Sequence, residues 1–194
     1  MCVLRLCILF LLMLTAGGCC WVVARSGDAK IVRCHQLIHE RNTKFFRMEL
    51  PEVSIAQVGT NILQVRNLPP YLTGLFNYNL FMIVPDEEEA LMPALCSKTH
   101  KEPPWQDAKI SITFQKLDGV EVFKESLTLG TTSHSAEGAP GGWKIGWNLG
   151  PGSYSSNPIP IKDDSFNIVV MVERPSRRVS DKLSISAYAI YRNP

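Results

Sequence analysis

Nine short runs of β-forming residues follow one another along the chain, and they constrain the fold more than any other feature of the sequence. Each run is rich in β-branched and aromatic residues and is bounded by Pro, Gly, Asn or Asp, which is typical of strands separated by turns. No long amphipathic helical stretch lies between them, which argues against βαβ units. The runs cover residues 45–50, 54–58, 61–67, 77–84, 109–115, 120–129, 142–149, 166–173 and 182–191. They predict an all-β fold, an antiparallel β-sandwich that is either jelly-roll-like or immunoglobulin-like.

Local signals add detail to this prediction. The pair Asp118-Gly119 tolerates the positive φ angles of a tight turn, so we expect a hairpin between the runs 109–115 and 120–129. In the last run, apolar and polar residues alternate from Leu183 to Ser186, which indicates a strand with one buried face. The stretch 130–142, GTTSHSAEGAPGG, has no large apolar side chain, and we expect it to be mobile.

The N-terminus carries the clearest targeting signal. No charged residue lies between Arg5 and Arg25, and residues 6–14 are a run of apolar side chains that leads into the small residues 16–18. A positive charge, an apolar core and a small-residue exit are typical of a secretory signal. We therefore expect residues 1–18 to be a signal peptide that directs export.

Three outcomes are open at the end of this segment. Residues 15–19, TAGGC, are similar to the lipobox of bacterial lipoproteins, although Ala16 stands where that family usually has Leu. This similarity implies that Cys19 carries the lipid. Val22-Val23-Ala24 is similar to an ordinary signal-peptidase site, and cleavage there would start the mature chain at Arg25. The third outcome is an uncleaved membrane anchor. We favour lipidation of Cys19, with residues 19–42 as a lipid-anchored tether and residues 43–194 as the β-sandwich domain.

Cysteine usage fits an exported protein. Of the six cysteines, Cys2 and Cys7 lie in the signal segment, Cys19 and Cys20 lie at its end, and only Cys34 and Cys96 follow it at a distance. Two thiols in an oxidising compartment are compatible with one disulfide. We expect that disulfide to join Cys34 to Cys96.

The charge balance of the sequence limits the classes of partner that the protein is expected to bind. Twenty Lys and Arg residues against eighteen Asp and Glu residues leave a formal charge of +2, without a basic stripe. Such a balance gives no electrostatic footprint for nucleic acid. The expected partners are the membrane, through the lipid, and a protein or glycan of unknown identity.

No motif indicates catalysis, a metal or a cofactor. His35 and His39 would lie one turn apart on a helix, but no second ligand cluster has a suitable spacing. Ser133 and His134 are adjacent in the sequence, so their side chains do not point at each other, and no G-x-S-x-G motif marks a nucleophile. The acidic run 86–89 lacks the spacing of a calcium loop. The sequence therefore favours a protein that is not an enzyme, without catalytic residues, metal or cofactor.

Three aromatic residues form a candidate ligand platform. Trp143, Trp147 and Tyr154 stand among glycines, and exposed aromatic rings stack on sugars. The alternation Trp143, Ile145, Trp147 also fits side chains that face the core of one strand. A carbohydrate-recognising module, released or anchored, is therefore the alternative function.

The stretch 148–190 resembles the C-terminal part of small, uncharacterised bacterial lipoproteins with a single β-sandwich domain. It shares with them a hairpin, a Tyr, an apolar strand, a Pro-Ser turn at residues 175–176 and a closing strand. The strand 46–50, which ends at Pro51, resembles the opening of their N-terminal half. The resemblance implies a sandwich held at a membrane in the bacterial cell envelope, facing the periplasm, with a binding or structural role. It transfers no catalytic residue.

Overall fold

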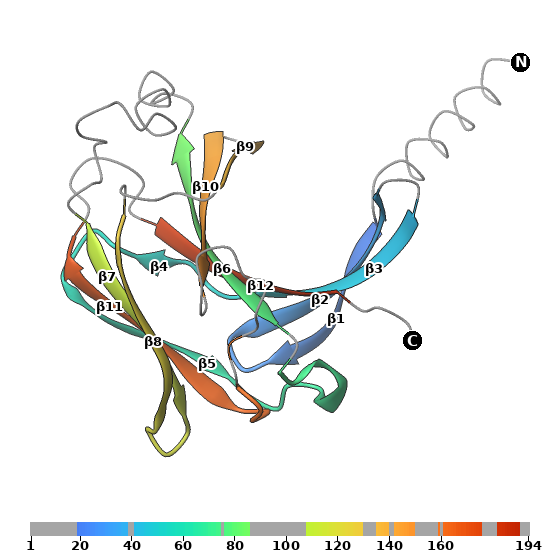
Figure 1. The fold of residues 1–194 in the computed structure, drawn as a ribbon, viewed down its shortest axis with the longest axis horizontal. Coiled ribbons are helices and arrows are strands. Elements are labelled where there is room, and N and C mark those ends of the chain that lie inside the picture. The colour runs from blue at the N-terminus through green and yellow to red at the C-terminus, as the bar shows by residue number, and fades with distance from the viewer. Residues whose placement is uncertain are drawn as a thin grey trace, which may run out of the picture.

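The computed structural model describes residues 19–38, 41–74, 76–85, 108–129, 135–139, 142–149, 159, 161–175 and 182–190. Over these residues the chain forms two antiparallel β-sheets that pack together (Figure 1). The predicted antiparallel β-sandwich is confirmed. In the described part of the chain, the one helical element is a short 3-10 turn, η1 (Pro70–Leu72), and no helix there is long and apolar enough to span a membrane.

The larger sheet has the strand order β1-β2-β3-β12-β6-β10-β9, and the short β4 pairs with β12 beside this path. Its strands are β1 (Cys19–Ser26), β2 (Ala29–Ile38), β3 (Arg41–Glu49), β4 (Val53–Ser54), β6 (Asn77–Pro85), β9 (Ser135–Ala139), β10 (Gly142–Leu149) and β12 (Lys182–Ile190). The smaller sheet has the order β5-β11-β7-β8. Its strands are β5 (Gly59–Val65), β7 (Lys109–Lys116), β8 (Glu121–Thr128) and β11 (Phe166–Arg174).

Most of the predicted strands are present. Eight of the nine runs overlap a strand of more than five residues, because period-two alternation and turn residues are local signals that need no distant partner. The run 54–58 is the exception, since only Val53–Ser54 pairs, with β12, and the chain bends before β5 begins.

The predicted tether over residues 19–42 is wrong. This segment forms β1, β2 and the start of β3, which pair with one another in antiparallel register. Ala29 and Ile31 of β2 are almost completely buried in the core between the sheets. The sandwich therefore begins at Cys19 rather than at residue 43. The prediction missed β2 because its apolar residues come in the adjacent pairs Ile31-Val32 and Leu37-Ile38, which do not alternate with polar residues.

The prediction of mobility for residues 130–142 also needs correction. Residues 135–139 form β9, which pairs with β10 through the register of Ala136 with Ile145. Backbone pairing needs no large side chain, so composition alone did not show this strand. Residues 130–134, 140 and 141 lie outside the described part of the chain.

The core lies between the two sheets and is rich in aromatic rings. Tyr78 on the large sheet meets Phe114 on the small sheet edge to face, with ring centroids 4.7 Å apart. Phe114 also contacts Phe123 and Phe166, with centroid distances of 6.0 and 6.4 Å. The edge-to-face arrangement adds a favourable quadrupole interaction to the burial of the rings. The contacts of Phe114 with Tyr78 and Phe166 join strands that are distant in sequence.

The β1–β2 turn is attached to the smaller sheet. Asp28 donates its backbone N–H to the Gln64 carbonyl oxygen at 2.8 Å, and the Gln64 N–H donates to the Asp28 carboxylate at 2.7 Å. Gly27 has a φ of 66°, a conformation that favours glycine. The turn thus connects the N-terminal hairpin of the large sheet to β5 of the small sheet.

The predicted hairpin at Asp118-Gly119 is confirmed. Gly119 has a φ of 87° and donates its N–H to the Lys116 carbonyl oxygen at 3.1 Å. The Asp118 carboxylate accepts a hydrogen bond from the Val120 N–H at 3.1 Å, which is the local interaction that Asp supplies in turns. This turn joins β7 to β8.

Candidate binding face

The large sheet has one side toward the core and one side away from the small sheet. On β12, Leu183, Ile185 and Ala187 are buried in the core, so Ser186 and Tyr188 lie on the opposite side of the strand. The same alternation places polar residues of β3 and β6 on that opposite side. We call six of these residues the polar outer face: Arg47, Glu49, Asn77, Asn79, Ser186 and Tyr188.

Strand register brings these six residues together in two rows. Ser186 on β12 lies opposite Glu49 on β3 and opposite Asn79 on β6. Tyr188 likewise lies opposite Arg47 and opposite Asn77. Cross-strand neighbours on one face of a sheet lie about 5 Å apart and interact directly. The polar outer face is therefore a contiguous patch over three adjacent strands.

The polar outer face contains side-chain atoms with unused hydrogen-bonding capacity. Among the described residues, six buried polar side-chain atoms lack a hydrogen-bond partner, and three belong to this face: Arg47 Nε, Asn77 Oδ1 and Ser186 Oγ. Ser186 as a whole is only 4% exposed. A buried polar atom without a partner costs about 1–3 kcal/mol, so such atoms are rare in folded proteins.

The charges on this face are nearly balanced. Arg47 and Glu49 form an ion pair along β3, and their side chains are 35% and 38% exposed. Lys30 on β2 lies opposite Glu49 and leaves one positive charge in excess at the margin. Partly exposed pairs of this kind contribute little to stability. The partly exposed side chains of the pair leave part of the guanidinium and carboxylate groups in contact with solvent.

Two aromatic rings adjoin the polar groups. Phe45 and Tyr188 are partly exposed, and their ring centroids lie 6.3 Å apart. Since Tyr188 is in the same row as Arg47 and Asn77, its ring has a polar neighbour on each side. The patch thus combines an apolar ring surface with donors and acceptors.

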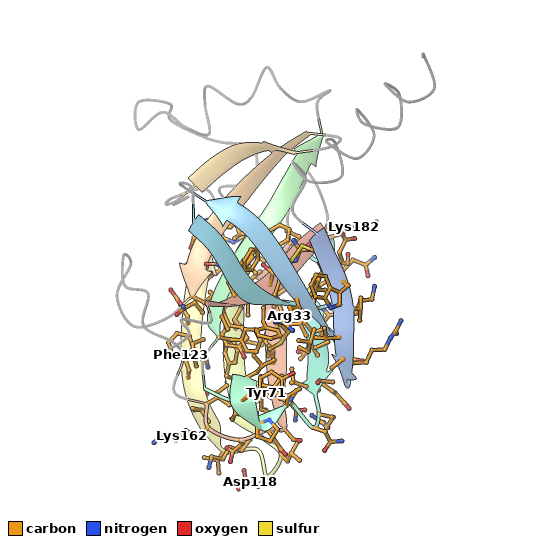
Figure 2. All side chains as sticks on the ribbon, turned by 90° about the vertical axis from the view of Figure 1, so that its right-hand side faces the viewer. Arg33, Tyr71, Asp118, Phe123, Lys162 and Lys182 are labelled. Atoms are coloured by element: carbon orange, nitrogen blue, oxygen red, sulfur yellow. A yellow bond between two sulfur atoms is a disulfide. The ribbon has the colours of Figure 1, made fainter. Side chains whose placement is uncertain are left out.

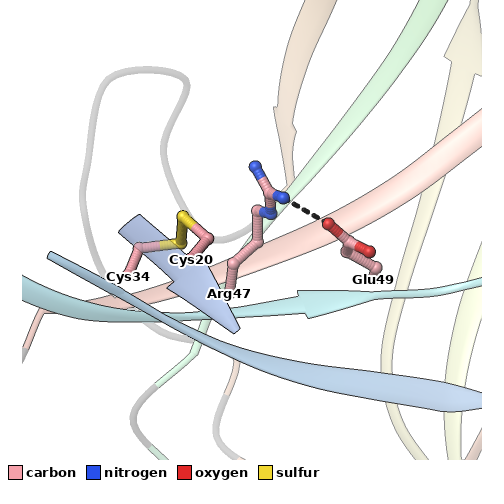
Figure 3. The surroundings of a disulfide bond; sticks show 4 residues. All are labelled: Cys20, Cys34, Arg47 and Glu49. Atoms are coloured by element: carbon pink, nitrogen blue, oxygen red, sulfur yellow. Dashed lines mark ion pairs between the residues drawn. A yellow bond between two sulfur atoms is a disulfide. The ribbon is translucent and has the colours of Figure 1, made fainter. Parts of the chain in front are cut away.

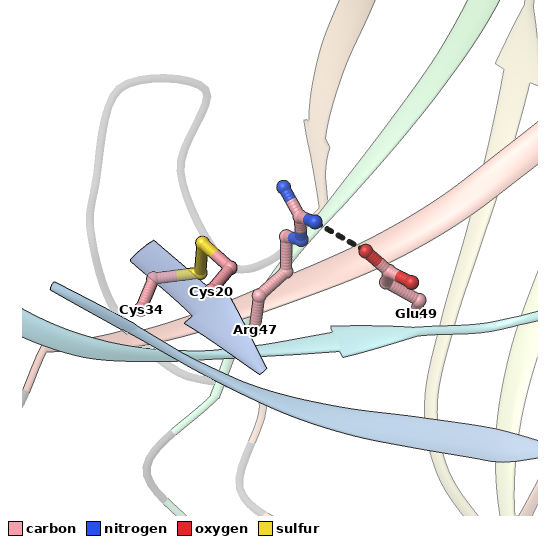
Figure 4. Close-up of polar contacts among 4 residues, drawn as sticks. All are labelled: Cys20, Cys34, Arg47 and Glu49. Carbon is pink, nitrogen blue, oxygen red and sulfur yellow. Dashed lines mark ion pairs between the residues drawn. A yellow bond between two sulfur atoms is a disulfide. The ribbon is translucent and has the colours of Figure 1, made fainter. Parts of the chain in front are cut away.

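A disulfide lies beside this patch. Cys20 on β1 is bonded to Cys34 on β2, with Cα atoms 4.2 Å apart. Figure 3 shows the disulfide on the same side of the strands as the Arg47–Glu49 ion pair, and the closer view in Figure 4 shows the same arrangement. The predicted bond between Cys34 and Cys96 is wrong here, because Cys34 is already bonded to its cross-strand neighbour. Cys96 itself lies outside the described residues.

The predicted aromatic platform is not present as expected. Trp147 is only 2% exposed and belongs to the core between the sheets, so it cannot stack on a ligand. Trp143 lies on the same strand, β10, but its side chain is outside the described part, as is all of Tyr154. The strand alternation that the sequence offered as the other interpretation holds for Trp147.

The remaining candidates contribute no site within the described residues. His35 is in strand β2, so the helical spacing assumed for His35 and His39 does not apply, and His39 lies outside the described part. The described residues contain no cluster of three metal-ligating side chains. Ser133, His134 and the acidic run 86–89 also lie outside them. Cys19 is the first residue of β1, opposite His35.

Sequence reasoning missed the polar outer face. The alternation in β12 was visible and indicated that Ser184 and Ser186 share a side. No signal in the sequence aligned them with residues of β3 and β6, which are more than 100 positions away. The arrangement is suited to binding, because it offers amides, a hydroxyl, an ion pair and an aromatic ring on one surface.

Comparisons with known proteins identify no family for this chain. No protein-family model and no curated protein matches it. Among solved structures, the carbohydrate-binding module CBM27-1 of Caldicellulosiruptor saccharolyticus in complex with mannohexaose is similar, with 10% identity, coverage of 87% of this chain and 86% of that one, and a TM-score of 0.39. The arabinose-bound α-L-arabinofuranosidase MgGH51 has 11% identity, coverage of 88% and 23%, and a TM-score of 0.29. At these values neither similarity carries an argument about function.

Proposed function

We propose that this protein is an exported β-sandwich of the bacterial cell envelope, anchored by lipid at Cys19, that acts as a binding module facing the periplasm. The observation that carries the proposal is the Cys20–Cys34 disulfide, which follows the apolar signal segment directly. Disulfides persist in oxidising compartments such as the periplasm and are rare in the cytosol. The disulfide therefore supports export.

The position of β1 argues against one of the three N-terminal outcomes, the cleavage after Ala24. Cleavage after Ala24 would remove Cys20 and leave only Arg25 and Ser26 of the eight residues of β1. Cys34 would lose its partner, and Ala24 would no longer pack against the core. Cleavage before Cys19 keeps the whole strand. In this arrangement the lipid attaches at the first residue of the sandwich, without a tether.

A binding role is supported by the polar outer face. It combines hydrogen-bonding side chains with the partly exposed ring of Tyr188 on one side of the large sheet. This polar outer face therefore supports the proposal of a binding module.

The test of the anchor is the mass of the mature protein isolated from its native membrane. We expect loss of residues 1–18 and addition of a diacylglycerol to Cys19, with the protein in the detergent phase. Cys19→Ser should abolish the modification. Cys20→Ser is the matched control, since it removes the neighbouring thiol and should leave lipidation intact.

Two results would contradict this proposal. A mature chain that begins at Arg25 would refute the anchor and favour the released form. A chain that retains residues 1–18 would establish the uncleaved anchor instead.

A further inference from the structure

We propose that the polar outer face binds a neutral glycan. The Tyr188 ring stacks against a sugar, and Arg47, Asn77 and Ser186 form hydrogen bonds with its hydroxyl groups. This inference rests on the proposed binding function and names its ligand class. It assigns the site to a surface different from the aromatic platform that the sequence suggested.

The unsatisfied atoms are the first argument. Arg47 Nε is a donor, Asn77 Oδ1 is an acceptor, and the Ser186 hydroxyl is both. A sugar hydroxyl also donates and accepts, so one ligand can satisfy a donor and an acceptor that lie on different strands. All three atoms are buried in this structure, so a ligand hydroxyl reaches them only when the side chains of this face rearrange.

The charge of the face is the second argument. The Arg47–Glu49 pair places opposite charges side by side, and the other members of the face are neutral. A phosphate or carboxylate ligand would meet the Glu49 carboxylate next to the guanidinium group. A hydroxyl pair instead accepts from Arg47 and donates to Glu49, in charge-assisted hydrogen bonds of the stronger kind. The balance therefore favours a neutral ligand with neighbouring hydroxyls.

The aromatic ring is the third argument. Tyr188 is partly exposed and packs against Phe45, which restricts its motion before a ligand arrives. One side of a sugar ring is lined by C–H groups, which pack on an aromatic face while the hydroxyls point outward. The two rows described above place hydrogen-bonding groups around the ring, where these hydroxyls would lie.

The experiment measures binding to the full-length protein, purified in a detergent without a sugar head group. The probes are neutral hexasaccharides of glucose, mannose, xylose and N-acetylglucosamine, titrated by calorimetry up to about 10 mM, the range of weak binding. Inorganic phosphate and vesicles that contain an anionic lipid are the competing probes. We expect at least one hexasaccharide to bind, and neither anionic probe.

Matched variants locate the site. Tyr188→Ala and Asn77→Ala should each weaken binding about tenfold or more, and Tyr188→Phe should retain most of it because the ring remains. The controls are Tyr71→Ala on η1, labelled in Figure 2, whose exposed ring lies beside the core residue Phe46, and Gln115→Ala on the small sheet. Both should bind within about twofold of the unchanged protein. Thermal unfolding of each variant separates loss of the site from loss of the fold.

The proposal is overturned if no hexasaccharide binds, if only an anionic probe binds, or if the Tyr71 and Tyr188 variants lose affinity equally. A protein with lipid at Cys19 and no affinity for any hexasaccharide would retain the anchor and refute the glycan site. Glycan binding by a protein whose mature chain begins at Arg25 would refute the lipid anchor and retain the glycan site.

Discussion

At the residue scale, Gly27 shows how one position connects the two sheets. Its φ of 66° lies in the left-handed region, and a Cβ there would collide with the Gln64 carbonyl oxygen. That oxygen accepts the Asp28 hydrogen bond that fastens the β1–β2 turn to β5, so it cannot move freely. We expect Gly27→Ala to lower the free energy of unfolding by about 2 kcal/mol or more, from strain and collision together.

Two other glycines provide the controls for this prediction. Gly119 has a φ of 87° but open space around it, so Gly119→Ala should cost only the strain, about 1 kcal/mol. Gly59 has neither a left-handed φ nor a neighbour within 4 Å, and Gly59→Ala should be nearly neutral. Urea unfolding gives the free energy of unfolding of each of the three variants. Equal losses at all three positions would contradict the role given to Gly27.

Tyr78 makes stability depend on pH at the alkaline end. Burial raises the pKa of the Tyr78 hydroxyl above its ordinary value, because the phenolate would have to lose its hydration. A raised pKa in the folded state means that the unfolded chain loses this proton first. The contribution of the neutral Tyr78 hydroxyl to the free energy of unfolding is fully present below the ordinary pKa of about 10. It is lost as the pH rises above that value.

Substitution of this hydroxyl tests the effect. We expect Tyr78→Phe to retain the ring contact with Phe114 and to reduce the loss of stability between about pH 10 and 12. Tyr71→Phe is the matched control, since Tyr71 is 54% exposed. Urea midpoints across this range provide the measurement. An identical alkaline loss in the Tyr78→Phe protein and the unchanged protein would refute the assignment.

At the scale of elements, the N-terminal hairpin depends on the disulfide and on its turn. The Cys20–Cys34 bond joins residues 14 positions apart near the open end of the β1–β2 hairpin. A loop of this length gives a stabilisation of up to about 3 kcal/mol, chiefly through the unfolded chain. The double change Cys20→Ala and Cys34→Ala should lower stability by up to this amount.

Reduction supplies the second readout for this hairpin. Dithiothreitol should lower the melting temperature of the unchanged protein toward that of the double variant and should leave the variant unaffected. A melting temperature that is insensitive to dithiothreitol in both proteins would contradict the contribution of this bond. Retention of glycan binding in the double variant would show that the polar outer face does not depend on it.

At the scale of the whole molecule, the sandwich places its anchor and its polar outer face on different strands of the same sheet. Cys19 begins β1, at one edge, and the face spans β3, β12 and β6 further in (Figure 1). The small sheet covers the other side of the large one, so its contribution to this face is to hold β3, β12 and β6 in register through the core. A ligand would therefore meet the side that points away from the small sheet.

The sequence by itself determined the fold class, most of the strands and the Asp118-Gly119 hairpin, because alternation and turn chemistry act between neighbouring residues. The tertiary structure decided which partners meet. It paired Cys34 with Cys20 rather than Cys96, turned Trp147 into the core and brought Arg47 beside Tyr188 across 141 positions of sequence. Register between distant strands depends on the packing of both sheets together, and no local pattern contains that information.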